Sequence, residues 1–176
     1  NLSDQSQLQW GIHYDRVENA NALNDTTWSF NQFSPRAGLS HQLGEGNTVK
    51  LAAFEVVLPF LSDRLAPADL VGIPLYRNGV EGSIIREWDL VWEQESDHTF
   101  ISATLFHAES DYPERQTNQS MREWQATVKG LELELNTIPA DQWGASAGYQ
   151  YKNIENEQVT SLDRSEQILD GTLSWV

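Results

Sequence analysis

The sequence predicts an all-β fold, an antiparallel up-and-down sheet of about eight strands, from two features of its hydrophobic pattern. The first is alternation: apolar and polar side chains alternate at period two in about eight separate stretches, as they do in strands with one face in an apolar phase. The second is spacing, because these stretches are joined by connections that are alternately long and short. We therefore treat residues 1–176 as a single all-β unit.

The two ends of this sheet differ in their connections. Short turns at one end and long loops at the other are typical of transmembrane β-barrels of bacterial outer membranes, so we predict such a barrel, either complete or a segment of a larger one. The expected long connections are 18–32, 59–82, 108–120 and 152–164, and the expected short ones are 44–47, 94–98 and 137–141.

The first three predicted strands span residues 6–17, 33–43 and 48–59. The glycine-rich segment 44–47 is typical of a tight hairpin turn between the second and the third. The third strand is apolar on both parities, so only its charges indicate its orientation. We place Glu55 toward a water-filled lumen, because an ionised group facing lipid costs several kcal/mol.

The next two predicted strands span residues 83–94 and 98–108, and the first of them is the most clearly amphipathic stretch in the chain. One face of it is apolar and the opposite face is acidic, as expected for a wall between lipid and water. The apolar face carries Trp88, Leu90 and Trp92, and the acidic face carries Glu87, Asp89 and Glu93.

The last three predicted strands span residues 121–136, 142–152 and 166–176. In the first of these the apolar parity switches between Val128 and Leu131. We expect a β-bulge near Gly130 to absorb this switch, because glycine tolerates the bulge conformation. Aromatic residues recur near strand ends, where barrels carry interfacial girdles: Trp10, Tyr14, Phe33, Phe60, Trp92, Phe100, Trp124, Trp143, Tyr151 and Trp175.

Composition narrows the class of partner. The chain has 26 acidic and 11 basic residues, for a net charge of −15, which argues against nucleic acid and anionic lipid head groups as main partners. It has no cysteine and no apolar run long enough for a transmembrane helix, which needs about 18 residues. The segment 1–4 lacks the features of a signal peptide, so we expect a mature, trimmed or partial chain.

Catalytic and cofactor motifs do not stand out. The four histidines are dispersed, and neither a nucleophile elbow nor a phosphate-binding loop is apparent. The carboxylate pairs Glu87/Asp89 and Glu132/Glu134 have the spacing of any polar strand face. The acidic segment with Glu109, Asp111 and Glu114 offers oxygen ligands for Ca²⁺ but lacks the order of a calcium loop. We therefore expect a protein that is not an enzyme and has no metal or other cofactor.

The long segment 59–82 differs from the other connections because it contains three prolines and several large apolar residues. Long loops of this kind commonly fold back and have a specific role. We expect it to fold into the lumen and constrict it, with Arg64, Asp69, Tyr76 and Arg77 at the constriction. A capping loop with a purely structural role is the alternative.

Four segments resemble Gram-negative outer-membrane barrels. The stretches 33–40 (FSPRAGLS), 49–54 (VKLAAF) and 129–134 (KGLELE) are similar to strands of TonB-dependent receptors. The stretch 65–73 (LAPADLVGI) looks more like the porin-like barrels of periplasmic tetratricopeptide-repeat proteins. Neither a plug domain nor helical repeats are present, and the last residues, Ser174-Trp175-Val176, replace the terminal phenylalanine typical of such barrels. The resemblance implies a location in the bacterial outer membrane, contact with its lipid, and periplasmic or energising partner proteins.

We therefore expect a barrel that forms a pore or receptor for a solute, a polymer or a metal chelate. Two alternatives remain open: a small closed barrel that binds a partner through its loops, and a soluble lipocalin-like carrier with the Trp88 and Leu90 face turned inward. An eight-stranded barrel has a tight interior, whereas a channel needs more strands. The expected lumen-facing residues are Arg36, Glu55, Glu87, Asp89, Glu93, Glu132 and Glu134.

Overall fold

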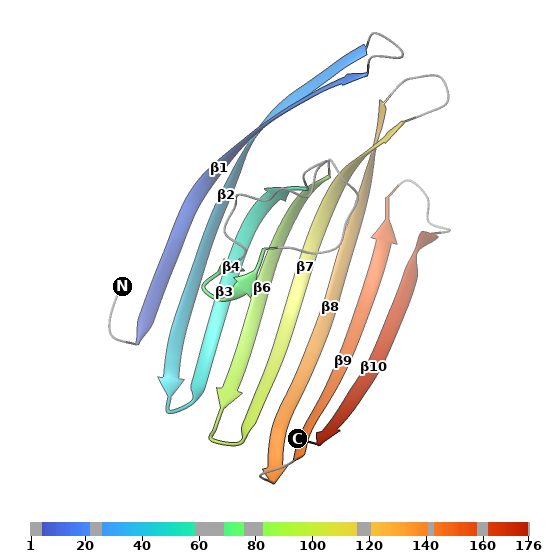
Figure 1. The fold of residues 1–176 in the computed structure, drawn as a ribbon. Helices are drawn as coiled ribbons and strands as arrows, with labels where there is room; N and C mark the ends of the chain where they lie inside the picture. Colours follow the sequence, from blue (N-terminus) through green and yellow to red (C-terminus); the bar gives the residue numbers. More distant parts are fainter. Residues whose placement is uncertain are drawn as a thin grey trace.

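Eight long strands form one antiparallel sheet in which each strand pairs with the next long strand along the chain (Figure 1). The computed structural model describes residues 5–21, 26–58, 69–75, 83–115, 121–140, 143–157 and 162–175. The long strands are β1 (Ser6–Asn21), β2 (Thr26–Gly44), β3 (Asn47–Val57), β6 (Ile84–Glu95), β7 (Thr99–Arg115), β8 (Met121–Ala140), β9 (Trp143–Asn156) and β10 (Arg164–Trp175). Two short strands, β4 (Asp69–Leu70) and β5 (Ile73–Pro74), form a separate hairpin.

The predicted all-β class and the up-and-down order of eight strands are confirmed. The sheet is curved but open (Figure 1), and β1 and β10 are its two edges, since each pairs with a single neighbour among the described strands. A closed barrel is therefore not present in the structure.

Three of the predicted loops are shorter than expected. Strand β1 continues to Asn21 and β2 begins at Thr26, so most of 18–32 is a paired hairpin arm. In the same way β7 extends into 108–120 as far as Arg115, and β9 extends into 152–164 as far as Asn156. The prediction failed because these arms lack the apolar alternation by which we recognised strands, whereas backbone pairing between two adjacent strands does not require it.

The other end of the sheet has the predicted short connections. Strands β2 and β3 are joined through Gly44–Asn47, β6 and β7 through residues 96–98, and β8 and β9 through residues 141–142. Strand β1 begins and β10 ends at this same end of the sheet (Figure 1). In the turn, Gly46 has a φ of 69°, a conformation that glycine adopts without steric cost.

The predicted bulge at Gly130 is wrong. Pairing runs without interruption from Phe106 through Gly130 to Lys152, and the irregularity in this strand falls between Thr137 and Ala140. Val128 therefore shares a face with Gly130 and packs against a buried cluster of Leu58, Ile85 and Ala108. The apolar residues of β8 switch from one face to the other along the strand because the concave face, polar in its middle, becomes apolar toward the long-loop end.

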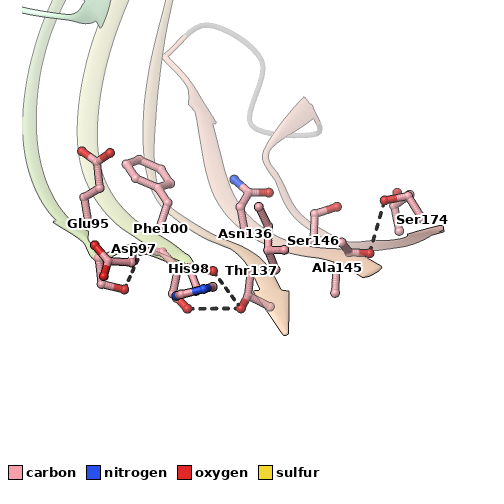
Figure 2. Close-up of a pocket in the computed structure, with 14 residues that line it drawn as sticks. Glu95, Asp97, His98, Phe100, Asn136, Thr137, Ala145, Ser146 and Ser174 are labelled. Atoms are coloured by element: carbon pink, nitrogen blue, oxygen red, sulfur yellow. Dashed lines mark hydrogen bonds between the residues drawn. The ribbon is translucent and has the colours of Figure 1, made fainter. Parts of the chain in front are cut away.

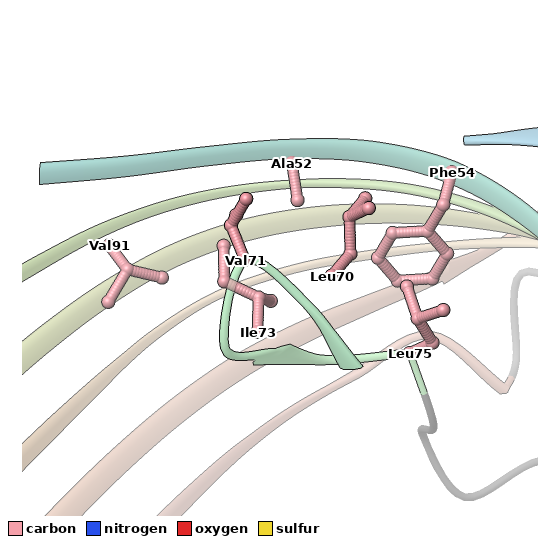
Figure 3. Close-up of a cluster of buried hydrophobic side chains, with 7 residues drawn as sticks. All are labelled: Ala52, Phe54, Leu70, Val71, Ile73, Leu75 and Val91. Carbon is pink, nitrogen blue, oxygen red and sulfur yellow. The ribbon is translucent and has the colours of Figure 1, made fainter. Parts of the chain in front are cut away.

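The main core lies between the concave face of the sheet and the β4–β5 hairpin (Figure 3). The sheet contributes Ala52, Phe54 and Val91, all at most 5% exposed. The hairpin contributes Leu70, Val71, Ile73 and Leu75, all at most 8% exposed. Segment 69–75 therefore folds back onto the sheet, as predicted for the long connection that contains it.

Candidate functional site

The two faces of the sheet differ in composition and in exposure. The convex face carries large apolar side chains that remain open to solvent, and the concave face carries most of the charged residues. Trp88 and Leu90 lie on the convex face at 47% and 40% exposure, whereas Glu87 and Asp89 between them are 4% and 0% exposed on the concave face. The predicted alternation of β6 is therefore confirmed.

Most of the exposed large apolar residues lie on the convex face in a band across the sheet, which we call the apolar belt. Aromatic side chains stand at its margins: Tyr14 and Phe33 have ring centroids 4.8 Å apart, and Trp143 is paired with Trp175. The belt comprises Leu8, Trp10, Ile12, Tyr14, Phe33, Leu39, Leu51, Trp88, Leu90, Leu105, Leu133, Leu135, Trp143, Leu169, Leu173 and Trp175.

The belt crosses the sheet obliquely. On β1 it extends from Leu8 to Tyr14, and on β10 it extends from Leu169 to Trp175, so it spans seven residues on each edge strand. At the short-turn end, the belt ends at Leu8 on β1 and at Trp175 on β10. Following the cross-strand pairs from β1 to β10 shows that Leu8 is level with Gln167, which precedes Trp175 by eight residues. The belt therefore descends by eight residues from one edge of the sheet to the other.

This descent defines an angle between the strands and the belt. Eight residues of strand correspond to about 26 Å, and the seven strand spacings between β1 and β10 correspond to about 34 Å. The belt is therefore inclined by about 38° from the perpendicular to the strands. Strands of membrane barrels tilt by about 35–45° from the barrel axis, so a belt of this slope lies level when the strands have that tilt.

Six of the seven residues predicted to face the lumen lie on the concave face. Cross-strand pairing places Arg36 and Glu87 in one row, through Phe54, and Glu93 and Glu134 in another, through Ser102. The remaining two, Asp89 and Glu132, share this parity on β6 and β8.

Glu55 is the exception. We predicted that it faces the lumen with the other six residues, but the strand register places it on the convex face. It has the parity of Leu51 and Ala53 on β3 and lies opposite Arg86 on β6. Its Oε2 accepts a hydrogen bond of 2.9 Å from Arg86 Nε, and Arg86 Nη1 donates another, of 2.8 Å, to Asp111. The charge is accommodated on this face because it is paired with Arg86, which lies two residues from the belt residue Trp88 toward the long-loop end.

Hydrogen bonds and one ion pair position the concave-face carboxylates. Lys50 Nζ lies 2.7 Å from Glu93 Oε1, and this lysine is only 14% exposed. Gln150 donates to Glu132, and Asn136 Nδ2 donates to Glu134 Oε1 over 2.6 Å. Cross-strand pairs of this kind fix the orientation of the side chains on a sheet face.

The β4–β5 hairpin is attached to this face by close packing and by one polar contact. Gly38 leaves room for it, since a Cβ at that position would lie 2.8 Å from Leu70 Cγ and 2.9 Å from Val71 Cγ2. Val71 N–H donates to Gln9 Oε1 over 2.9 Å. Val71 has a φ of 49°, a strained value for a β-branched residue. Its side chain is buried in the cluster between hairpin and sheet, and this packing offsets the backbone strain.

Only one of the four residues predicted for a constriction falls in the described part of the chain. Asp69 begins the hairpin and is exposed. Arg64, Tyr76 and Arg77 lie outside the described residues. Sequence reasoning missed two residues that hold the hairpin: Gly38 and Gln9. Only Gly38 carried a signal, as a glycine in a strand, which often marks a close approach.

The sheet has shallow hollows at its short-turn end and on its convex face. One lies at the short-turn end (Figure 2), where Thr137 Oγ1 donates to the carbonyl of His98 over 3.1 Å. Its lining combines the charged or titratable side chains Glu95, Asp97 and His98 with small ones such as Ser146 and Ser174. Among the described residues these do not form a group that could hold a metal ion. A second hollow on the convex face lies beside Trp88 and His107, whose rings stack with centroids 5.6 Å apart.

The described residues contain no group of three or more histidine or acidic residues that could hold a metal ion. Glu109 and Asp111, which we considered for Ca²⁺, belong to strand β7 instead of a loop. Asp111 is engaged by Arg86 and by Gln125, and the side chain of Glu114 lies outside the described residues. Within the described ranges, no helix is long and apolar enough to span a membrane.

No protein-family model matches the chain, and no curated protein matches it. Functional inference therefore depends on the two faces of the sheet, the belt and the hairpin.

Proposed function

We propose that this chain forms part of the wall of a transmembrane β-barrel in a bacterial outer membrane. In this proposal the apolar belt contacts lipid, and the concave face lines a polar lumen. The barrel acts as a pore or receptor for a solute, a polymer or a metal chelate, and the resemblance to receptor and porin-like barrels extends the proposal to periplasmic or energising partner proteins.

The slope of the belt is the observation that supports this proposal most strongly. Contiguous exposed apolar patches of more than a few hundred Å² are rare on soluble monomers, and they mark surfaces that contact a membrane or another protein. A sheet that inserts in a membrane needs such a band. For the band to lie level in the bilayer, its inclination from the perpendicular to the strands must equal the tilt of the strands from the barrel axis. The inclination of about 38°, calculated from the pairing register and ideal strand spacings, lies within the range expected for a barrel wall.

Two further observations favour transport over the alternatives. The concave face combines charges with small side chains and carries a docked hairpin, as expected for a constricted lumen. A lipocalin-like carrier needs Trp88 and Leu90 in its interior, but both have the parity opposite to that of Val91, which packs against the hairpin. The residues proposed to set the field in the lumen are Arg36, Glu87, Asp89, Glu93, Glu132 and Glu134.

A matched pair of substitutions tests the proposal. Leu133 and Glu134 are adjacent and exposed, and lie on opposite faces of β8. We expect Leu133→Arg to destabilise the membrane-inserted form by about 2–4 kcal/mol, because arginine then faces the lipid. Glu134→Arg should leave insertion intact and change only ion selectivity.

The measurement is refolding into lipid vesicles, followed by urea titration and by conductance in a planar bilayer. The proposal requires folding that depends on detergent or lipid, together with ion conductance. Folding in plain buffer to the same sheet content, or equal effects of the two substitutions on insertion, would contradict it.

A further inference from the structure

The hollow on the convex face lies between two rows of residues that cross strands β2, β3, β6 and β7. The row nearer the short turns is joined by strand pairing: Ala37, Ala53, Trp88 and His107. The other row lies two residues nearer the long-loop end of each strand: Pro35, Glu55, Arg86 and Glu109. The volume of the hollow is about 510 Å³, and sites for small molecules measure about 300–1,000 Å³.

The β2–β3 end of the hollow is lined by small apolar side chains. Pro35, Ala37 and Ala53 are all exposed there. On β2 the first two lie between the belt residues Phe33 and Leu39. If the sheet forms a barrel wall, as the proposed function states, this end of the hollow opens to the hydrocarbon of the bilayer.

The β6–β7 end of the hollow is charged. Arg86 lies between Glu55 and Glu109 in its row, and 46% of its side chain is exposed. The side chain of Glu109 is 57% exposed, and its Oε1 lies 3.5 Å from Nε2 of His107. On β7 both His107 and Glu109 lie beyond the belt residue Leu105 toward the long-loop end. This end of the hollow therefore lies at the margin of the belt.

The hollow thus runs obliquely from the belt to its margin. A row of paired residues is perpendicular to the strands, whereas the belt is inclined by about 38° from that perpendicular. Three strand spacings separate β2 from β7, about 14 Å, so the charged end lies about 9 Å nearer the long-loop side of the bilayer than the apolar end. A lipid molecule has the same polarity along its length, with an acyl chain at one end and a head group at the other.

The charges at the β6–β7 end favour a head group that carries an ammonium. The described residues there include three carboxylates and one guanidinium: Glu55, Glu109, Asp111 and Arg86. On the next strand, Lys129 is paired with Glu155 over 3.8 Å. An anionic head group meets this excess of negative charge, whereas a zwitterionic one places its phosphate against Arg86 and its ammonium against Glu109. A primary ammonium has three N–H donors for these carboxylates.

We propose that this hollow binds one phospholipid whose head group contains a primary ammonium. Its acyl chain lies over Ala37 and Ala53, and its head group lies at Arg86 and Glu109. The lipid fills the gap that the small residues leave in the belt, and it gives this part of the convex face a preference among lipids that contact with hydrocarbon alone does not give.

Native mass spectrometry of the protein refolded in detergent tests this proposal. The probes are phosphatidylethanolamine, phosphatidylcholine and phosphatidylglycerol with identical acyl chains, added separately to the chain of 20.0 kDa. Ala53→Phe fills the apolar end of the hollow. Its control is Ala147→Phe, at an exposed position of the convex face outside the hollow. Glu109→Gln removes a carboxylate at the charged end, and its control is Glu155→Gln, where the carboxylate is similarly exposed, at 55%.

We expect one phosphatidylethanolamine molecule to bind about tenfold more tightly than the other two lipids, the effect of one additional charge-assisted hydrogen bond. Ala53→Phe should abolish this preference and Glu109→Gln should reduce it, whereas both controls should retain it. Equal affinity for the three lipids, or equal effects of the test variants and their controls, would overturn the proposal.

The same lipids with brominated acyl chains distinguish failure of this site from failure of the barrel wall. In vesicles, bromine quenches the fluorescence of tryptophans that contact the chains, such as Trp88. Quenching by all three lipids without a difference in affinity overturns the site and leaves the wall in place. Absence of quenching by any of them contradicts the wall, and the lipid site with it.

Discussion

At the scale of single residues, the alternation of adjacent side chains carries most of the functional information. Leu90 and Asp89 are neighbours in sequence, yet one is 40% exposed on the convex face and the other is fully buried on the concave face. Period-two alternation is sufficient to predict this facing. It was insufficient for Glu55, because its facing depends on Arg86 of the adjacent strand, and pairing between distant residues is not visible in a local pattern.

Gly130 shows how a residue-scale feature controls packing. A Cβ at this position would overlap the ring of Phe106 and the carbonyl oxygen of Tyr151, and a backbone oxygen in a paired strand has little freedom to move. We expect Gly130→Ala to lower the free energy of unfolding by about 1–3 kcal/mol, as overpacking does.

Urea unfolding of the protein refolded in detergent measures this effect. Gly44→Ala is the matched control, because a Cβ there meets nothing within 4 Å. Equal stability of the two variants would show that the close approach of Phe106 to Gly130 is not important for the sheet.

At the scale of elements, the existence and order of the long strands were predictable, but several of their ends were not. Strands with an apolar face, such as β6, were found within one residue at each end. The arms of β1, β2, β7 and β9 at the long-loop end were missed, because their polar residues lack alternation. The apolar character of 59–82 predicted that it folds back, but the hairpin turn at Val71 was not predictable, because a β-branched residue rarely has positive φ.

The hairpin is the element whose role is most directly testable. Leu70 is 1% exposed at its docking surface, so we expect Leu70→Asn to undock it, because an amide buried there without a partner costs about 1–3 kcal/mol. A hairpin released from the wall should change single-channel conductance in a planar bilayer.

Asp69→Asn is the control within the same hairpin, because Asp69 is exposed. If Leu70→Asn lowers stability but leaves conductance equal to that of Asp69→Asn, the hairpin is a structural cap and not a constriction. Sequence reasoning left these two roles open.

At the scale of the whole molecule, the charge of the concave face sets the expected selectivity. Among the described residues of this face, acidic side chains outnumber basic ones: Asp15, Glu87, Asp89, Glu93, Glu95, Glu132, Glu134, Glu166 and Asp170 against Arg36, Lys50, Lys152 and Arg164. A lumen lined by carboxylates concentrates cations and excludes anions.

We therefore expect the reversal potential under a salt gradient to indicate cation preference. The double variant Glu132→Gln with Glu134→Gln should reduce that preference, and the effect should decrease at high ionic strength because salt screens the field. Glu109→Gln is the control, since Glu109 lies opposite Arg86 on the convex face. Anion preference in the unmodified protein would contradict the assignment of the concave face to the lumen.

The central claim is that the convex face contacts lipid while the concave face contacts water, and a cysteine scan of residues 131–135 in vesicles tests it most directly. Each single-cysteine protein is labelled with a fluorophore and exposed to a quencher confined to the hydrocarbon and, separately, to one confined to water. We predict that the hydrocarbon quencher acts at positions 131, 133 and 135, and the aqueous quencher at 132 and 134. Quenching without this alternation, or with the two sets of positions exchanged, would contradict the account.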